Sequence, residues 1–296
     1  MKYKIGTRGS VLALAQTDLV IDRLKTAYPG DSFEAVVIRT TGDKRLDVSL
    51  DAIGGKGVFV DAIEAALQRG EIDMAVHSMK DMPDQPAQGL IFAAAWERED
   101  PRDVLITREG LTFEQLPLHA KIGTGSRRRM YELRSLRPDL TIVPIRGNID
   151  TRIRKMQEEK LDGIVLAAAG LKRIHRESEI TQFFPVEEVI PAPAQGVLAI
   201  ELRENDAALL QKLDALSDKA TARLVDAERT FLKEIGGDCH LPAGAYAREE
   251  ADGALTLFAL FGNEDGSRLA RTSVRGDDAK AVAKAAADRL KRELGM

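Results

Sequence analysis

The densest group of residues that could bind an anion is Gly123-Thr124-Gly125-Ser126-Arg127-Arg128-Arg129, which is followed by Arg146-Gly147-Asn148 and Arg152. Glycines allow a backbone to approach a ligand, a helix N-terminus offers free N–H groups, and guanidinium groups pair bidentately with carboxylate or phosphate. Three consecutive arginines are also typical of a solvated helix face. Ligands of open α/β sheets lie beyond the carboxyl ends of the strands, and Arg146 and Arg8 each follow a predicted strand. This position favours an anion site.

A second candidate is the segment 76–83, where Lys80 and Asp81 stand side by side just past another predicted strand. An aspartate held in a closing cleft stabilises developing positive charge or exchanges protons with a substrate. The alternative is an ordinary charged pair on the surface. His77 lies in the middle of the predicted strand, and we interpret it as a packed histidine rather than a base.

Two connecting segments also contain candidate functional residues. Residues 41–57 (TGDKRLDVSLDAIGGKG) form a long stretch with little periodicity, which predicts a flexible lid or plain disorder. The lone cysteine, Cys239, lies between two glycines and a proline. A single cysteine is usually a small buried hydrophobe, but these neighbours predict an exposed loop, where a thiol acts as a nucleophile or an attachment point.

The elements that position these residues indicate an α/β fold, because strand-like runs alternate with amphipathic helical runs over the first 200 residues. The predicted strands are 3–7, 33–39, 73–78, 90–96, 103–107 and 196–202, and the predicted helices begin after Ser10, which serves as an N-cap, and at Val58. The pattern changes after residue 220, with a helix at 221–235, strands near 243–248, 254–261 and 270–275, and a helix from Asp277. This region predicts a small α+β domain.

Two short echoes indicate an internal duplication. Lys121-Ile122-Gly123-Thr124 repeats Lys4-Ile5-Gly6-Thr7, and Ile145-Arg146 repeats Ile38-Arg39. A polar interruption at 97–102 and a proline-rich segment at 185–193 predict two crossings between lobes that face each other across a cleft. We therefore expect a first lobe formed by 1–98 and 197–216, a second lobe formed by 102–190, and a C-terminal domain formed by 219–296 that carries Cys239.

Composition excludes several classes of protein. The 43 basic and 47 acidic residues give a net charge of −4, which argues against a general nucleic-acid binder. No apolar run approaches the roughly 20 residues of a membrane-spanning helix. The start of the chain carries no run typical of a signal peptide, so we expect a cytoplasmic protein. One cysteine and four scattered histidines predict no metal site. A binding module, a two-lobed anion receptor without chemistry, is the principal alternative to an enzyme.

Six motifs, which occur along the chain in the order typical of the family, resemble porphobilinogen deaminase, also called hydroxymethylbilane synthase. They are His77-Ser78-Met79-Lys80-Asp81, Gly54-Gly55-Lys56-Gly57, Arg146-Gly147-Asn148 with Arg152, the LAAAGLKR run at 166–173, Pro193-Ala194-Gln195-Gly196 and the late glycine-rich cysteine loop. The resemblance covers essentially the whole chain. It implies two lobes like those of periplasmic binding proteins, joined by a double crossover, and a C-terminal domain that carries the cysteine.

The resemblance also implies the chemistry. Members of the family join four porphobilinogen molecules in succession, lose ammonia at each step and release hydroxymethylbilane. They use a dipyrromethane cofactor that a cysteine holds through a thioether bond, and Cys239 matches that cysteine. Positive charge builds on a pyrrole nitrogen at each step, and Asp81 matches the catalytic carboxylate. Acetate and propionate groups make the growing chain anionic, which explains the arginines. The resemblance implies a single small-molecule substrate, no nucleic-acid or membrane partner, and a monomer.

Further residues match the family's binding positions. Cofactor binding is implied for Lys80, Ser126, Arg128, Arg129, Arg146 and Gly147, and substrate binding for Arg8, Ser10, Lys56, Arg152 and Arg173. Two departures stand out. The family commonly has a serine and a hydrophobic residue where this chain has Gly125 and Arg127, and it commonly has no residue equivalent to Asp238 between the glycines and the cysteine. A carboxylate beside Cys239 disfavours the thiolate and would slow cofactor attachment.

Overall fold

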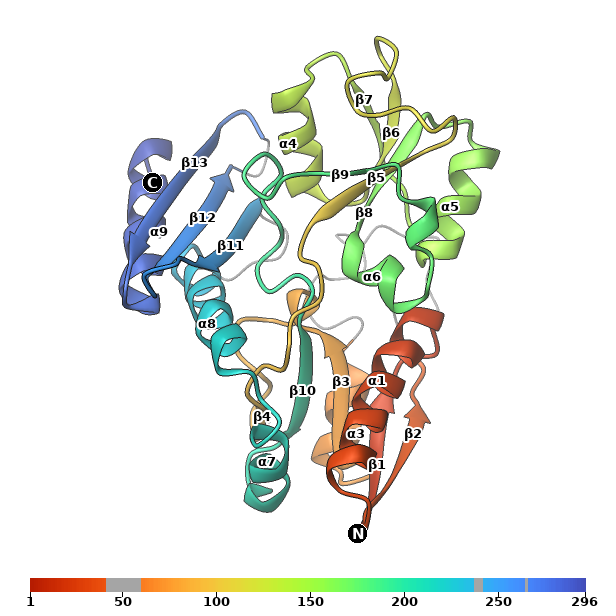
Figure 1. Cartoon of the computed structure of the whole chain (residues 1–296), viewed down its shortest axis with the longest axis vertical. Coiled ribbons are helices and arrows are strands. Elements are labelled where there is room, and N and C mark those ends of the chain that lie inside the picture. The colour runs from red at the N-terminus through yellow and green to blue at the C-terminus, as the bar shows by residue number, and fades with distance from the viewer. Residues whose placement is uncertain (41–59, 237–241, 264–265) are drawn as a thin grey trace. The chain divides into compact units, whose positions relative to one another are not determined.

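The computed structural model describes residues 1–40, 60–236, 242–263 and 266–296 (Figure 1). It divides the chain into two units. The first contains Met1–Glu97 and Val197–Lys219, and the second contains Arg98–Gly196 and Ala220–Met296. The chain therefore leaves the first unit after Glu97 and returns to it at Val197. The predicted lid at 41–57 lies outside the described residues.

The first unit is built on a five-stranded sheet with the strand order β2-β1-β3-β10-β4. β1 is parallel to β2 and β3, and β10 is antiparallel to β3 and β4. In chain order the elements are β1 (Lys2–Thr7), α1 (Val11–Ala27), β2 (Ser32–Val37), α3 (Asp61–Gln68), β3 (Met74–Ser78), the 3-10 turn η2 (Met79–Asp81), β4 (Leu90–Phe92), β10 (Leu198–Arg203) and α7 (Ala207–Asp214).

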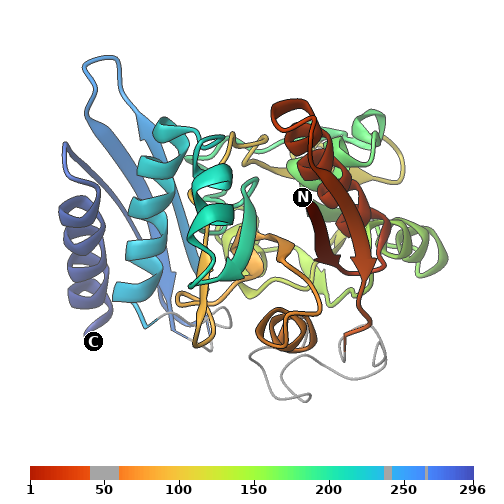
Figure 2. The same cartoon turned by 90° about the horizontal axis from the view of Figure 1, so that it is seen from below.

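Alternation along the strands gives this sheet two apolar faces. Residues such as Met74 and Val76 pack with α1 and α7, whereas Ala75 packs with α3. Neighbouring residues of a strand point to opposite faces, so α1 and α3 cover opposite sides of the sheet, as Figure 2 shows. α1 begins shortly after β1 ends, so its N-terminus lies near the carboxyl end of that strand.

The second unit contains a five-stranded sheet with the order β7-β6-β8-β5-β9. β6 is parallel to β7 and β8, and β5 is antiparallel to β8 and β9. Its elements are β5 (Asp103–Thr107), β6 (Lys121–Gly123), α4 (Arg127–Leu136), β7 (Thr141–Val143), α5 (Ile149–Glu158), β8 (Gly163–Ala167), α6 (Ala168–Arg173), η3 (Glu177–Glu179) and β9 (Gln182–Phe183).

The two sheets have the same design. In each, three neighbouring parallel strands are followed by one antiparallel strand, which is β10 in the first sheet and β5 in the second. β1 corresponds to β6, and these strands hold the two KIG echoes that the sequence analysis identified. α4 and α5 cover opposite faces, as α1 and α3 do. The structure thus supports the duplication that the echoes indicated.

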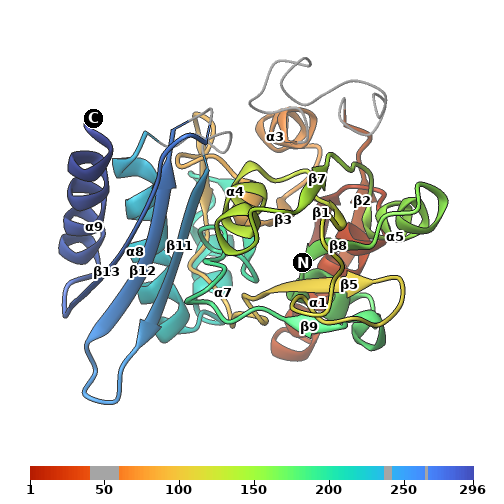
Figure 3. The same ribbon diagram turned by 90° about the horizontal axis from the view of Figure 1, so that it is seen from above.

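The rest of the second unit is a three-stranded antiparallel sheet with the order β11-β12-β13 and two helices. The elements are α8 (Lys219–Glu234), β11 (Ala243–Glu249), β12 (Leu255–Gly262), β13 (Leu269–Gly276) and α9 (Ala279–Leu294). Apolar residues of both helices and of one sheet face form a single buried cluster, so α8 and α9 share that face (Figure 3). The opposite face is left for contacts with the loop before β10.

Most predicted elements lie within a few residues of the observed ones. The prediction of a strand over 90–96 was too long, because pairing with β10 ends near Ala93 and the next backbone N–H, that of Ala94, donates to the Asp214 carboxylate at 2.8 Å. The residues of the predicted C-terminal domain form their own sheet but belong to the second unit. A division into three domains stays a prediction.

Candidate active site

Two parallel strands of the first unit end side by side, and each is followed by predicted site residues. β1 ends at Thr7 and leads through Arg8 to Ser10, whose hydroxyl accepts from the Ala13 N–H at 3.2 Å and caps α1. β3 ends at Ser78, whose hydroxyl accepts from Gln16 Nε2 of α1 at 2.9 Å. The predicted capping role of Ser10 is confirmed, and helix α1 is tied to the end of β3.

Asp81 lies in the turn η2 that directly follows β3. The Met79 N–H donates to the Val197 carbonyl at 3.0 Å, which fixes the start of the turn to the strand that returns from the second unit. Asp81 is exposed and Lys80 is half-buried. The turn therefore presents the Asp81 carboxylate to solvent at the carboxyl edge of the sheet.

His77 is packed, as the sequence analysis predicted. Its ring is buried in β3, and Nε2 lies 3.2 Å from a carboxylate oxygen of the fully buried Glu201 of β10. Both side chains point to the face that α3 covers, because they alternate with residues that pack against α1. His77 belongs to the interior and not to the exposed edge.

The second unit has a corresponding edge. Ser126 caps α4 by accepting from the Arg129 N–H at 3.4 Å, and Asn148 caps α5 by accepting from the Thr151 N–H at 2.8 Å. Gly147 has φ of +118°, and a β-carbon there would lie 2.5 Å from the Thr151 side chain. Two helix N-termini, with free N–H groups, therefore point to the edge that carries the predicted anion site.

Close packing explains why residue 125 is a glycine. A β-carbon at that position would lie 2.9 Å from the carbonyl oxygen of Ile145, so the loop after β6 packs directly on the loop after β7. The half-buried Arg146 follows Ile145. Arg152 of α5 donates from Nε to the carbonyl of Gly147 at 2.8 Å, which joins the helix to this loop.

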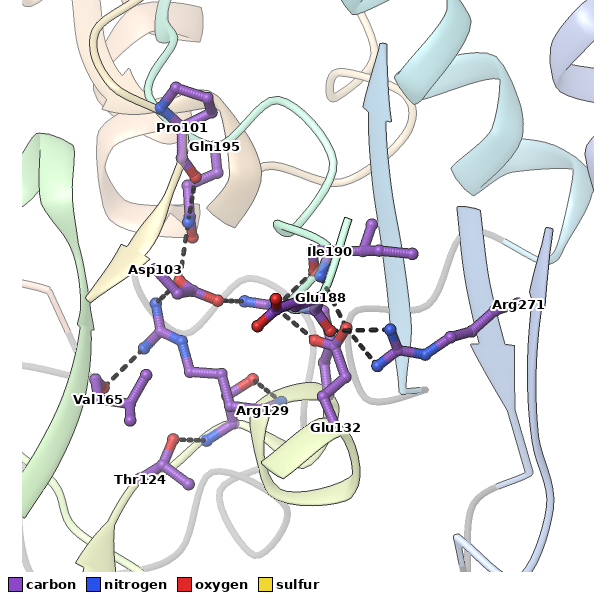
Figure 4. A network of polar contacts seen from close by, with 12 residues as sticks. Pro101, Asp103, Thr124, Arg129, Glu132, Val165, Glu188, Ile190, Gln195 and Arg271 are labelled. Atoms are coloured by element: carbon purple, nitrogen blue, oxygen red, sulfur yellow. Dashed lines mark hydrogen bonds and ion pairs between the residues drawn. The ribbon is translucent and has the colours of Figure 1, made fainter. Parts of the chain in front are cut away.

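Arg128 and Arg129 are not on a solvated face. They are only 4% and 5% exposed, so that alternative is wrong for both of them. Each donates to the carboxylate of Asp103, the buried first residue of β5, Arg128 at 2.7 Å and Arg129 at 2.6 Å. Arg128 also donates to Glu132 at 2.8 Å. Figure 4 shows this network.

The charges of the network are unequal. Burial alone would raise the pKa of Asp103, but the guanidinium groups of Arg128 and Arg129 outweigh it and hold that pKa below its ordinary value. Burial raises the pKa of Glu132 to about 7, with Arg128 and Arg271 acting in the opposite direction. Asp103 is therefore the carboxylate of this network that stays firmly ionised at neutral pH.

Arg173, at the end of α6, contacts the segment that leads back to the first unit. It donates from Nη2 to the Gly196 carbonyl, and burial lowers its pKa to about 10. It therefore remains a cation at neutral pH. Gly196 has φ of +92°, and a β-carbon there would lie 2.3 Å from the carbonyl oxygen of Glu99, so glycine is required where the two passages of the chain run together.

The structure thus places the predicted site residues in two groups. Arg8, Ser10, Lys80 and Asp81 lie at the carboxyl edge of the first sheet, and Ser126, Arg128, Arg129, Arg146, Gly147, Arg152 and Arg173 lie at or next to that of the second. Lys56, Asp238 and Cys239 lie outside the described residues. Among the described residues, no group of three or more His, Cys, Asp or Glu could hold a metal ion, and no helix is long and apolar enough to cross a membrane.

Sequence reasoning missed the acidic partners of the arginines. Asp103 was assigned only as the start of a strand, and Glu132 was not considered. The four-residue spacing of Arg128 and Glu132 on a helix was a usable signal, because such residues face each other. No comparable signal connects Asp103 with residues 25 positions further along the chain.

Two family models together match most of the chain. Residues 3–211 match the dipyrromethane cofactor-binding domain of porphobilinogen deaminase, and residues 222–292 match the C-terminal domain of porphobilinogen deaminase. The boundary between the matches falls close to the start of α8.

Curated relatives and solved structures are also similar to the chain. The porphobilinogen deaminase of Lachnospira eligens is 56% identical over 98% of this chain and 99% of its own, and that of Clostridioides difficile is 51% identical over 94% and 92%. Among solved structures, a Salmonella typhimurium periplasmic binding protein described for its high arginine specificity has a TM-score of 0.42 and 17% identity, over 75% of this chain and 93% of its own.

Proposed function

The chain belongs to the porphobilinogen deaminase family, and on that premise we propose which of its residues carry out the family's reaction. The protein is a transferase of tetrapyrrole biosynthesis. It joins four porphobilinogen molecules head to tail, releases ammonia at each step and yields hydroxymethylbilane, with a dipyrromethane cofactor as the primer.

The residues at the edge of the second sheet suit a cofactor that carries acetate and propionate groups. The Nε of Arg129 is buried and, among the described residues, has no hydrogen-bond partner. A buried donor without a partner is costly, and a ligand carboxylate would remove that cost. When bound, the dipyrromethane supplies the pyrrole carbon to which the first substrate is joined. We assign its carboxylates to Lys80, Ser126, Arg128, Arg129, Arg146 and Gly147.

Cys239 is the proposed attachment point. It is the one cysteine of the chain, and a thioether requires a thiol. Asp238 next to it disfavours the thiolate, which predicts slower cofactor attachment and no change in its location.

The substrate is assigned to a separate set of cations. Arg8, Lys56, Arg152 and Arg173, with the hydroxyl of Ser10, would bind the carboxylates of incoming porphobilinogen. Arg173 suits this role because its pKa of about 10 keeps it protonated at neutral pH. A chain of pyrroles gains two carboxylates with each unit, so the number of cations limits how many units are held.

Asp81 is the proposed catalytic residue. The observation that carries this role is its position, because the exposed carboxylate follows β3 directly on a turn whose start is fixed by the Met79 to Val197 hydrogen bond. A carboxylate held at that edge stabilises positive charge on a pyrrole nitrogen without having to reorganise. Loss of ammonia from the substrate and addition of the next unit both develop such charge.

Replacement of Asp81 by Asn tests this assignment. The change keeps size and some hydrogen bonding but removes the charge, so we expect turnover to fall by about 10²- to 10⁴-fold. The melting temperature should barely change, because Asp81 is exposed. Asp84→Asn, in the loop that follows, is the matched control and should turn over normally. Near-normal turnover per folded Asp81→Asn molecule, with a lowered melting temperature, would make Asp81 a structural partner of Lys80.

The proposal also includes the oligomeric state and the cellular location of the enzyme. We propose that the enzyme acts as a cytoplasmic monomer, as the sequence analysis predicts, and that it has no nucleic-acid partner, because its net charge of −4 does not favour one. Light scattering at micromolar concentration tests the first part, and a dimer mass would refute it. Fractionation of cells that produce the protein tests the second, and recovery outside the cytosolic fraction would refute it.

A further inference from the structure

A buried carboxylate lies directly beneath the arginines of α4. Asp103 is fully buried, and both its oxygens accept hydrogen bonds from side chains. Oδ2 accepts from Arg128 Nη2 at 2.7 Å, and Oδ1 accepts from Arg129 Nη2 at 2.6 Å and from Gln195 Nε2 at 2.8 Å. One carboxylate therefore fixes two neighbouring guanidinium groups at once (Figure 4).

Each guanidinium is also held at a second nitrogen. Nη1 of Arg128 donates to the Ile190 carbonyl at 2.6 Å and to Glu132, and Nη1 of Arg129 donates to the Val165 carbonyl at 3.0 Å. A planar group held at two nitrogens has its plane fixed, and the directions of its remaining N–H groups are fixed with it. For Arg129 one of these is the Nε–H, which has no partner among the described residues.

The network also carries a surplus of positive charge. Two arginines share the carboxylate of Asp103, while Glu132 is shared by Arg128 and by Arg271 of β13, whose Nη2 lies 3.3 Å from Oε1. Burial of charge is tolerated where charges are paired, so the uncompensated charge of such a group favours an anion beside it. The surplus lies at the N-terminus of α4, where the free N–H groups act in the same sense.

We propose that Asp103 is a positioning residue for the reaction: it orients Arg128 and Arg129 toward the carboxylates of the bound pyrrole chain. This inference rests on the proposed binding role of those arginines. Asp103 itself touches no ligand. Gln195 supports it from the segment that returns to the first unit, because the same Nε2 that donates to Asp103 lies 2.7 Å from the carbonyl of Pro101.

Asp103→Asn tests the inference, with Asp139→Asn as its matched control. Asp139 pairs with Arg137 at the other end of α4, at 2.7 Å, and has no part in the proposed site. A misdirected binding group costs about 10- to 100-fold, so we expect kcat/KM for porphobilinogen to fall by that factor in Asp103→Asn, with part of the loss in KM. The control should stay within about twofold.

A double-mutant cycle separates positioning from a merely structural role. If Asp103 acts through Arg129, the Asp103→Asn change should cost less than about threefold once Arg129 is already Gln. Equal losses in both backgrounds would overturn the inference. If Asp103→Asn does not fold, Gln195→Met replaces it in the cycle, because that change removes one hydrogen bond to Asp103 and leaves the charges in place. A Gln195→Met loss that is independent of Arg129 would likewise overturn it.

The outcome also distinguishes this inference from the proposed function. A wild-type protein that carries no covalent pyrrole and releases no tetrapyrrole would refute the proposed function. A loaded and active wild type, together with an Asp103→Asn variant that behaves like Asp139→Asn, would refute only the positioning role.

Discussion

The arginines of this chain differ in burial and in hydrogen-bond partners, so they should respond differently to substitution. Arg128 and Arg129 are buried and paired with Asp103, whereas Arg154 of α5 is 63% exposed and pairs with Glu158 one helical turn away. Truncation of a buried arginine leaves its carboxylate without compensation and costs several kcal/mol, whereas loss of an exposed pair costs about 1 kcal/mol or less. The residues best suited to test ligand binding are therefore those between these extremes, such as the half-buried Arg146.

Arg146→Leu should weaken engagement of substrate or cofactor by about 2 to 5 kcal/mol, because the arginine follows β7 next to Gly147 and would pair with a partly desolvated carboxylate. Arg154→Leu is the matched control and should cost under about 1 kcal/mol. Mass spectrometry after mixing with porphobilinogen follows the stepwise formation of substrate adducts. Adduct kinetics equal to those of the control would assign Arg146 to the solvated surface.

Helix α3 carries a partly buried glutamate, Glu64, whose negative charge is unfavourable in the folded state. Burial raises the pKa of Glu64 to about 7, and the carboxylates of Glu201 and Asp61 add to that increase. The folded state therefore prefers the protonated side chain. Glu201 is the buried partner of His77, so protonation of Glu64 relieves the repulsion between the two carboxylates.

The raised pKa predicts how stability depends on pH. A carboxyl group whose folded pKa lies above its unfolded value of 4.5 contributes stability that is complete below pH 4.5 and is lost as the pH rises through about 7. Glu64→Gln mimics the protonated form, so it should match the wild type at pH 4, below the unfolded pKa of 4.5. At pH 7.5 the variant should be more stable by about 1 kcal/mol, a value reduced for solvent screening because Glu64 is half-exposed. Urea unfolding measures the stability of the wild type and of the variant at each pH. A stability difference that does not change with pH would contradict the prediction.

The sequence predicted the elements far better than the contacts between them. Caps and strand ends are local, so Ser10 and the strand at 103–107 could be identified from neighbouring residues. Burial of Arg128 and Arg129 could not, because it depends on Asp103. That residue precedes them by 25 and 26 positions and reaches them only when β5 lies beside β8. The roles of the site residues came from family motifs, because spacing alone left an anion receptor as an alternative to an enzyme.

Across the whole chain, another buried carboxylate connects segments that are distant in sequence. Glu228 of α8 accepts from Arg98 at 2.6 Å, from the Ala194 N–H at 2.6 Å and from the Ala247 N–H of β11 at 2.8 Å. It therefore joins the segments that leave and return to the first unit with the sheet that follows α8.

We expect this chain to hold its own primer covalently at Cys239, and the intact mass of the freshly purified protein reports on that attachment. The wild type should exceed the mass of its polypeptide by two linked pyrrole units. Cys239→Ser should fold but show the polypeptide mass alone, because a hydroxyl is far less nucleophilic than a thiol near neutral pH. A wild type that turns over porphobilinogen at the bare polypeptide mass, or a Cys239→Ser variant that carries the full added mass, would contradict it.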